Sequence, residues 1–420
     1  MAMSSLIAST SKAIDYSLPP SPVYILRGHT AQISCVNFSD DGTALFSGDV
    51  EGWVITWNLS SFRPRLVWKP HEAGILTIEE FDDGLLTHGR DNKIHHFQLP
   101  KSLRSITRSA ASAVPSVKDP TPLHPDWSMD VNAMAYCQMS LLRIASEEAD
   151  GGKGKGKERA LVAVPALTKD EQVDIFHLPT LSRVHRSIGE GCFIGSKTGT
   201  VMAIELFTNP TSPSQLHLLA AYEDGRIALF SYTSSPSSAV SLPTNYRSES
   251  EGWGLKWISK GHREAVMSMA LSPDKKEAWS IGADHYLCRY RLWEEEEDKR
   301  LDRFEMTGPG KSAVGVRDDG RIIAVSGWDG EVHICSTKSG KPLAVLTYHR
   351  TSLQTLAFAP TRQSAERDAE GDNESDDEED RGNGQQRAWL ATGGKDERIS
   401  LWDIYPPHSL PAMTSSLGTQ

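Results

Sequence analysis

The sequence lacks several features that would indicate common classes of protein. It has no apolar run near the about 20 residues that a membrane-spanning helix needs, and its serine-rich start has no signal-peptide core. Stretches with the period of an amphipathic helix are scarce. These absences predict a soluble, intracellular chain that makes no membrane contact and is built mainly from strands.

Cysteine is scarce too, and its spacing argues against two kinds of site. The chain has five cysteines, never spaced as Cys-x-x-Cys: Cys35, Cys137, Cys192, Cys288 and Cys335. Neither a disulfide framework nor a zinc site fits this pattern, so we interpret them as buried strand residues. Because a phosphate-binding loop and a unique nucleophile with its base are also missing, we expect no metal, no cofactor, no small-molecule ligand and no catalytic residue.

Negative charge dominates, but it is concentrated in one place. The formal net charge is −11, and residues 366–380 alone carry ten acidic residues against one arginine, so the rest is close to neutral. Nothing in it resembles the basic footprint of a protein that binds nucleic acid directly. We interpret the acidic run as a solvated insertion, with binding of histones or other basic partners as the alternative.

The chain is rich in short runs of Val, Ile, Thr and aromatic residues, separated by Gly, Asp, Ser and Pro. In the clearest example, residues 389–404, a strand, a small-residue turn and a second strand end at Trp402 and Asp403. Units of about 40 to 45 residues with four such strands are typical of WD repeats. We count seven between residues 22 and 405, which predicts an all-β, seven-bladed WD-repeat β-propeller.

A His, a Ser or Thr, an Asp and an aromatic residue recur at matching positions. They are His29, Ser47 and Trp57 in the first unit; His71, Thr87, Asp91 and Phe97 in the second; His262, Ser280, Asp284 and Tyr290 in the fifth; and His349, Thr392, Asp396 and Trp402 in the seventh. A catalytic triad uses similar residue types but is needed only once. We therefore interpret the set as a hydrogen-bonded network within each blade.

Four units depart from this pattern. Glu51 occupies the Asp position of the first unit, which predicts an altered network there. The third unit keeps Asp170 but has no clear His, and the fourth keeps Asp224. The sixth keeps Asp329 and has Cys335 at the aromatic position.

The order of strands predicts how the ring closes. If each unit supplies the outer strand of one blade and the inner three of the next, residues 23–26 pair with residues 399–404. Low-complexity insertions at residues 147–159 and 361–387 then leave one face, and short loops lie on the other. The first insertion contains Lys and Gly, which we interpret as flexible, with a nuclear-import signal as the alternative. Residues 1–21 and 406–420 are expected to be disordered tails.

The face with short loops is the candidate partner surface. It carries Arg90 and Asn92 at one turn, Lys197 in a longer loop and Trp328 at another turn. Trp328 either anchors a partner or packs on the neighbouring blade. A second interpretation places Trp328 and Tyr222 in an aromatic cage that binds histone tails or modified peptides.

Several strings resemble one family more closely than a generic WD repeat. In order they are LRGH (26–29), LTHGRDN (86–92), KTGTVMA (197–203), YEDGR (222–226), GWDG (327–330) and KPLAVL (341–346). Together they resemble the fungal ASTRA-associated protein 1 family, whose animal relatives are called G-protein β-subunit-like, from about residue 22 to residue 407. The insertions and Cys335 depart from the family pattern.

The resemblance implies a non-catalytic scaffold subunit of the ASTRA complex in the nucleus, with the cytoplasm as a second location. Its partners would be a Tel2–Tti1–Tti2-type co-chaperone, the RuvB-like ATPases and a large phosphatidylinositol-3-kinase-related protein, and its roles chromatin remodelling and maturation of those kinases. The alternative is a generic WD-repeat adaptor or reader that binds histone tails or other peptides on the propeller face. A true G-protein β-subunit is disfavoured because residues 1–20 lack heptads for a helical partner.

Overall fold

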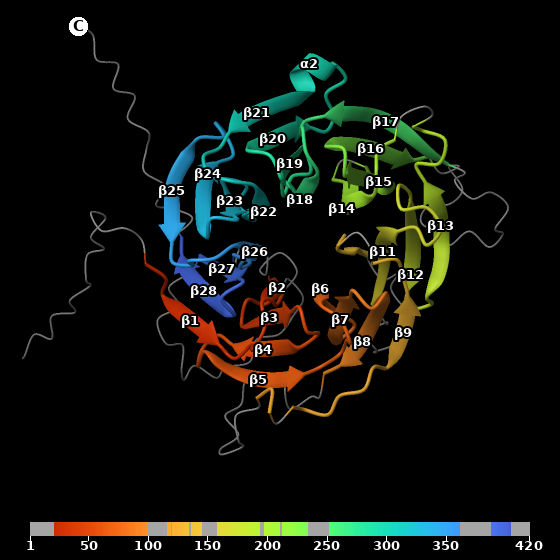
Figure 1. The fold of residues 1–420 in the computed structure, drawn as a ribbon. Helices are drawn as coiled ribbons and strands as arrows, with labels where there is room; N and C mark the ends of the chain where they lie inside the picture. The colour runs from red at the N-terminus through yellow and green to blue at the C-terminus, as the bar shows by residue number, and fades with distance from the viewer. Residues whose placement is uncertain are drawn as a thin grey trace, which may run out of the picture.

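The computed structural model of the protein describes residues 21–99, 116–118, 120–133, 136–144, 158–193, 197–210, 212–233, 252–361 and 388–404. Within these ranges the chain forms a ring of seven four-stranded antiparallel sheets (Figure 1). The predicted seven-bladed, all-β propeller is therefore confirmed. Residues 1–20 and 405–420, and most of both predicted insertions, lie outside the described residues.

The first three blades follow one another along the chain. Their strands are β2 (Ile33–Phe38), β3 (Ala44–Asp49), β4 (Val54–Asn58) and β5 (Arg63–Trp68); β6 (Ile75–Phe81), β7 (Gly84–Gly89), β8 (Lys93–Gln98) and β9 (Trp127–Asp130); and β10 (Ser140–Ile144), β11 (Arg159–Pro165), β12 (Val173–Leu178) and β13 (Ser182–Ile188). The first strand of each blade is the innermost of the ring.

The next three blades repeat this order. Their strands are β14 (Val201–Asn209), β15 (Ser212–Tyr222), β16 (Arg226–Tyr232) and β17 (Trp253–Lys260); β18 (Val266–Leu271), β19 (Glu277–Gly282), β20 (Tyr286–Arg291) and β21 (Leu301–Glu305); and β22 (Lys311–Val316), β23 (Ile322–Gly327), β24 (Glu331–Ser336) and β25 (Pro342–Thr347). One helical turn, α2 (Glu297–Arg300), precedes β21. No helix among the described residues is long and apolar enough to cross a membrane.

The last blade joins both ends of the described chain. It contains β26 (Leu353–Phe358), β27 (Trp389–Gly394) and β28 (Arg398–Asp403), and its outer strand is β1 (Tyr24–Arg27). β1 pairs antiparallel with β28, with Tyr24 opposite Leu401 and Arg27 opposite Arg398 (Figure 1). This is the pairing expected from the sequence, and it leaves no open sheet edge between the first and last blades.

Middle strands are buried along their whole length because neighbouring blades cover both faces of each sheet. Every residue of β3, β7, β23 and β27 is buried. Burial on both faces explains why these strands do not alternate apolar and polar residues: apolar side chains come together in the first half of each, and the Ser or Thr that follows is also buried.

The apolar core is divided among the interfaces between blades. The buried hydrophobic residues that the structure describes form seven clusters, each shared by two adjacent blades. In one of them Leu26 of β1 and Leu401 of β28 pack with Trp57 of β4, so the last blade is joined to the first. Because no blade has a core of its own, each depends on its neighbours for stability.

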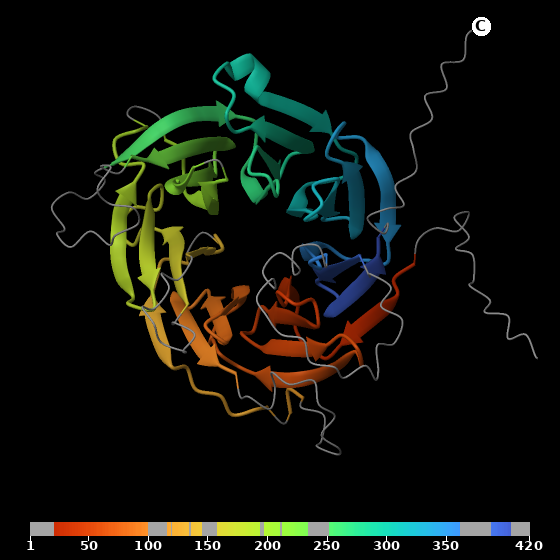
Figure 2. The same cartoon turned by 180° about the vertical axis from the view of Figure 1, so that it is seen from behind.

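The connections separate into two faces, seen in Figures 1 and 2. We call the face with the outer-to-innermost and second-to-third-strand connections the short-loop face. The predicted insertions fall in the connections after β10 and β26, between the first and second strands of their blades, and most of their residues lie outside the described ones. Two boundary residues behave differently: Arg159 already belongs to β11, and Thr361 is buried and donates its hydroxyl to Asp318 Oδ2 at 2.7 Å.

The five cysteines were expected to be buried strand residues, and three of them are. Cys35, Cys288 and Cys335 lie buried in strands, and Cys137 is buried outside a strand. Cys192 is exposed in the connection after β13, so the interpretation as a buried strand residue is wrong for it. Burial raises the pKa of the Cys335 thiol to about 11, as expected for a core residue with no reactive role.

Candidate protein-interaction face

In the first blade the polar network is complete but uses an unexpected carboxylate. Trp57 Nε1 donates to Ser47 Oγ at 2.8 Å, and His29 Nε2 lies 2.8 Å from the same oxygen. His29 Nδ1 lies 2.8 Å from Asp49 Oδ2, and the other oxygen of Asp49 accepts from two backbone N–H groups of the next turn at 3.0 Å. Glu51 is exposed. The network is therefore altered, as expected, but it is complete, because Asp49, two positions earlier, takes the place of the usual Asp.

The fifth blade has the network as predicted. His262 Nδ1 lies 2.9 Å from Asp284 Oδ1, and Nε2 lies 2.7 Å from Ser280 Oγ. Burial alone would raise the pKa of Asp284, but hydrogen bonds from His262 and from backbone N–H groups lower it to about 2. Asp284 is therefore an ionised, fully bonded acceptor inside the blade, and Tyr290 at the aromatic position is buried.

In the seventh blade the network contains one more residue. His349 Nδ1 lies 3.0 Å from Asp396, and Nε2 lies 2.9 Å from Ser400 Oγ and 3.2 Å from Thr392 Oγ1. Trp402 Nε1 donates to Ser400 at 2.8 Å. Ser400, which sequence analysis missed, therefore links the tryptophan to the histidine. The sequence could have indicated this, because Ser400 stands two residues before Trp402 in the same strand and therefore lies on the same face of the sheet.

In two other blades a different residue takes the role of the histidine. In the third, Asn132 Nδ2 donates to Asp170 Oδ1 at 3.0 Å. In the sixth, Lys311 is fully buried, donates its Nζ to the Thr307 carbonyl at 2.7 Å and lies 3.9 Å from Asp329 Oδ2. Burial lowers the pKa of Lys311, and Asp329 opposes that shift. An asparagine or a lysine thus holds the Asp carboxylate in place of the histidine. A search of the sequence for histidine cannot find these two networks.

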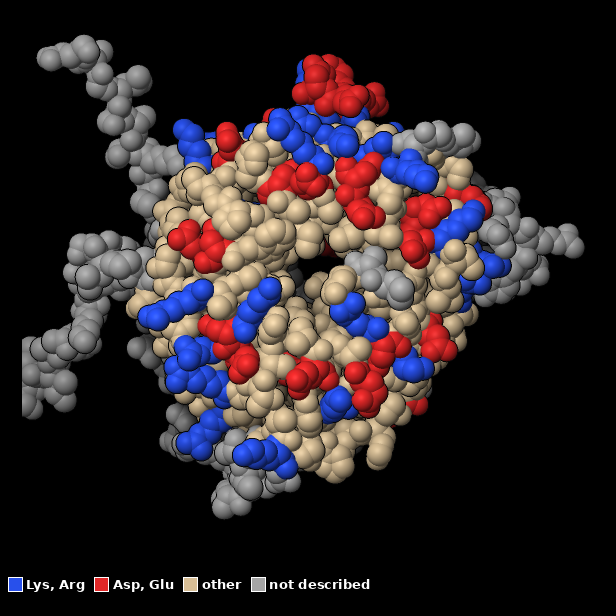
Figure 3. All heavy atoms as spheres, in the orientation of Figure 1, with Lys and Arg blue, Asp and Glu red and all other residues tan. Residues whose placement is uncertain are grey.

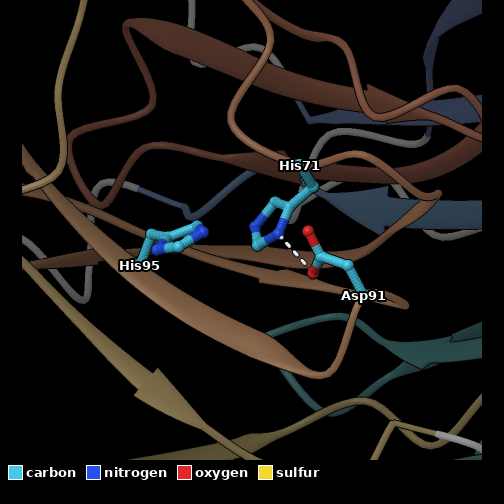
Figure 4. A group of neighbouring side chains, drawn as sticks. All are labelled: His71, Asp91 and His95. Atoms are coloured by element: carbon cyan, nitrogen blue, oxygen red, sulfur yellow. Dashed lines mark hydrogen bonds and ion pairs between the residues drawn. The ribbon is translucent and has the colours of Figure 1, made fainter.

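In the second blade the network is joined by another histidine. The possible ligand atoms of His71, Asp91 and His95 lie within 4.8 Å of one another (Figure 4). However, these ring nitrogens already have protein partners. His71 Nδ1 lies 2.8 Å from Asp91 and Nε2 lies 2.9 Å from Thr87 Oγ1, and His95 Nδ1 lies 2.7 Å from Ser128 Oγ. Burial lowers the pKa of His95 to about 4. We therefore assign the cluster to the blade network, as predicted for His71, Thr87 and Asp91.

Turn glycines connect these networks to the preceding blades. Gly225 follows Asp224 with φ +88°, and a Cβ there would lie 2.4 Å from the carbonyl oxygen of His262 in the next blade. Gly52 and Gly330 make the same approach to the carbonyls of His71 and His349. Only glycine permits this contact, so the turns of the short-loop face are held against one another as a rigid surface.

Arg90 and Asn92 occupy the turn between β7 and β8, as predicted, but have different roles. Arg90 is exposed, and its guanidinium lies 3.6 Å from the ring centroid of Tyr136. Tyr136, which sequence analysis missed, is 60% exposed and has φ +58°. Asn92 has φ +63° and accepts a hydrogen bond from the Ala133 N–H at 3.0 Å, so its side chain positions the connection before β10. Arg90 and Tyr136 remain available to a partner.

Lys197 and Trp328 also lie on the short-loop face. Lys197 is exposed in the connection before β14, and Trp328 is 41% exposed in the turn between β23 and β24. The Trp328 ring approaches Gly310, where a Cβ would meet it at 2.7 Å. Trp328 is therefore partly packed on the preceding connection and partly open. No hydrogen bond, ion pair or ring contact joins Arg90, Lys197 and Trp328, so the described residues show three separate positions.

The proposed aromatic cage does not form around Tyr222. This side chain is fully buried, and its ring centroid is 5.2 Å from that of Phe193. It belongs to the interface between the third and fourth blades. The interpretation of Tyr222 as a cage residue is therefore wrong: its position next to a turn made it look accessible, but β15 is a middle strand.

The central channel is lined by the innermost strands of all seven blades and encloses about 330 Å³. Two acidic side chains, Glu79 of β6 and Glu205 of β14, face it. Burial raises the pKa of both to about 7; Arg143 opposes the shift for Glu79, and Lys275 opposes it for Glu205. Near pH 7 the channel wall therefore carries partly protonated carboxyl groups.

The fold and the repeated networks define a WD-repeat β-propeller whose His, Ser or Thr and Asp sets are structural. In agreement, residues 20–58 match the family model described as WD domain, G-beta repeat.

Relatives that match along almost the whole chain identify the family within the WD-repeat propellers. ASTRA-associated protein 1 of Penicillium rubens is 30% identical over 94% of this chain and 100% of its own length. The protein of that name from Verticillium alfalfae is 32% identical over 94% and 96%. Guanine nucleotide-binding protein subunit beta-like protein 1 of Mus musculus is 26% identical over 92% and 97%. The chain belongs to the ASTRA-associated protein 1 family, as its motifs predicted.

Proposed function

We propose that the protein is a non-catalytic scaffold subunit of the ASTRA complex. The observation that carries this proposal is the whole-ring similarity to relatives whose names describe them as ASTRA-associated. The use of the His, Ser or Thr and Asp sets inside the blades supports a binding role, because none of these sets is left over for chemistry. A ring of mutually supporting blades presents fixed loops, which suits simultaneous contact with several proteins.

The partners in this proposal are a Tel2–Tti1–Tti2-type co-chaperone, the RuvB-like ATPases and a large phosphatidylinositol-3-kinase-related protein. The protein would act in the nucleus, in chromatin remodelling and in maturation of those kinases. Contact is expected through the short-loop face, where Arg90, Lys197 and Trp328 are exposed. An exposed tryptophan and arginine are the residue types that most often dominate binding energy at interfaces.

Affinity purification of the tagged protein from its native cells, followed by mass spectrometry, tests this function. Recovery of the co-chaperone and kinase subunits is expected. Combined Arg90→Glu and Trp328→Ala changes should reduce that recovery about tenfold or more, as expected for loss of two anchor residues. Lys338→Glu, an exposed position in a turn of the opposite face, is the control. Wild-type protein that recovers histones but none of these subunits would instead favour the alternative, a reader of histone tails.

A further inference from the structure

A small basic pocket lies where the fourth blade meets the fifth, beside the connection from β17 to β18. It encloses about 290 Å³ and is lined by Lys260, Gly261, His262, Arg263, Tyr286 and Arg303. Figure 3 shows Lys and Arg side chains gathered above this part of the ring, over β17, β20 and β21. No carboxylate lines the pocket.

The three cations of the pocket are not neutralised by ion pairs. Among the described residues no carboxylate lies within ion-pair distance of Lys260, Arg263 or Arg303. By contrast, Arg289 and Arg291 of the same blade both bind Asp302, with Arg291 at 2.7 Å. The pocket therefore holds positive charge that the fold itself does not use.

Backbone contacts hold one of these cations in place. Arg303 Nε donates to the Gly261 carbonyl at 2.7 Å, and its NH2 group donates to the Lys260 carbonyl at 2.6 Å. Carbonyl oxygens orient the guanidinium but leave its net charge intact. A pre-positioned cation of this kind loses little conformational entropy when an anion binds.

Asp284, in the turn between β19 and β20, does not line the pocket. Asp284 is 8% exposed, and its oxygens accept from His262 and from the N–H groups of Arg263 and Tyr286. The blade network thus engages Asp284, and Glu264, the carboxylate of the connection itself, is exposed and does not line the pocket. The Tyr286 ring lies 5.8 Å from the Arg263 guanidinium and forms a flat wall of the pocket.

We propose that this pocket binds a carboxylate side chain of an extended acidic segment in a protein partner. The inference rests on the proposed scaffold function and names the chemistry of one contact. Its volume lies at the lower limit of the about 300–1,000 Å³ typical of small-molecule sites, which suits one side chain better than a cofactor. Nucleic acid would require positive charge spread along a stripe, whereas here it is confined to one pocket.

Fluorescence anisotropy with a labelled ten-residue Asp/Glu-rich peptide tests the proposal on the full chain. Arg263→Gln and Lys260→Gln should each weaken binding about fivefold at low ionic strength, and together more than tenfold. Arg303 is left intact because it holds the backbone. Lys338→Gln, with the same charge change on the opposite face, should have no effect. A peptide in which Asn and Gln replace every Asp and Glu is the charge control and should bind more weakly. The proposal would be overturned if Lys338→Gln weakened binding as much as the pocket variants, if the double variant bound as tightly as the wild type, or if the Asn/Gln peptide bound as tightly as the acidic one.

The chain's own acidic run is the competing occupant. Deletion of residues 366–380 should leave the affinity for the peptide unchanged if the pocket serves a partner. A several-fold gain in affinity would assign the pocket to the run itself and overturn the proposal. The melting temperature of each variant must equal that of the wild type, which separates loss of the site from loss of the fold.

Purification of the Lys260→Gln, Arg263→Gln double variant from native cells separates this inference from the proposed function. Loss of one complex subunit, with the others retained, is expected. If the wild type recovers the complex subunits but the peptide does not bind, the inference fails and the scaffold role stands. If the peptide binds through the pocket but the wild type recovers no complex subunit, the scaffold role fails and the acidic-segment site stands.

Discussion

Replacement of Asp49 by Ala tests the network of the first blade most directly. The change removes a carboxylate that is fully buried and accepts from the His29 ring at 2.8 Å and from two backbone N–H groups at 3.0 Å. All three donors would lose their partner, and the His29 ring would lose it in a buried place. Glu51, which sequence position alone assigns to this role, is exposed and serves as the matched control.

The expected cost follows from these contacts. Hydrogen bonds to a charged group each contribute about 1.5–3 kcal/mol, and loss of one member of a buried pair costs about 3–5 kcal/mol, so we expect Asp49→Ala to destabilise by about 4 kcal/mol. With about 2.1 cal/mol/K of unfolding entropy per residue, a ring of this size has about 0.8 kcal/mol/K, and Tm falls by about 5 °C. Glu51→Ala, at an exposed position, should change Tm by less than about 1 °C.

Differential scanning calorimetry at one scan rate measures both variants against the wild type. Equal Tm values for Asp49→Ala and the wild type, or a larger drop for Glu51→Ala, would refute the assignment of Asp49 to the network. Circular dichroism at 20 °C should show the same strand content in all three proteins, because the ring remains folded at that temperature.

Three further changes test the ring, its closure and its channel. Gly225→Ala should destabilise by about 2–4 kcal/mol, because it combines a positive φ with a backbone clash, whereas Gly254→Ala, which has open space, should change Tm little. Deletion of residues 1–26 should lower Tm of the whole ring by removing most of β1, and deletion of residues 366–380 should not; equal melting after the first deletion would contradict closure through β1. Because burial raises the pKa of Glu79 to about 7, the folded state holds its proton more tightly than the unfolded chain, and stability should fall as pH rises from about 4.5 to about 7. Glu79→Gln should flatten that fall in urea-unfolding series, and an unchanged pH profile would contradict the assignment.

The fold was predictable because most units carry the same local signals. Turn glycines, short apolar runs and the aromatic at the end of the third strand recur at a fixed spacing, and a repeat architecture depends mostly on contacts between neighbours. Even the closure could be inferred, since an unpaired first strand implies a partner at the other end of the chain. Cys192 and Tyr222 were misjudged because exposure depends on which strand and which neighbouring blade cover a residue.

The candidate interaction face was less predictable. Arg90, Lys197 and Trp328 could be assigned to one face from connectivity, but their separation, and the stacking of Tyr136 on Arg90, depend on the three-dimensional path of the connections. The basic pocket joins Lys260 and Arg263 to Arg303, which lies about 40 residues further along the chain in the outer strand of the next blade.

The sequence by itself determined the number and type of the blades, the family and the residues of most polar networks, because these depend on local periodicity and on residue types at fixed spacing. Only the tertiary structure decided which atoms complete each network and which charges remain unpaired. Asp49 replaces Glu51, and Lys311, from the start of β22, replaces a histidine that stands four residues before the strand in other blades. A carboxylate or a cation needs only to reach the buried site, and its position in the chain can shift. The unpaired cations of the basic pocket, likewise, become recognisable only once the fold shows which carboxylates are already bound elsewhere.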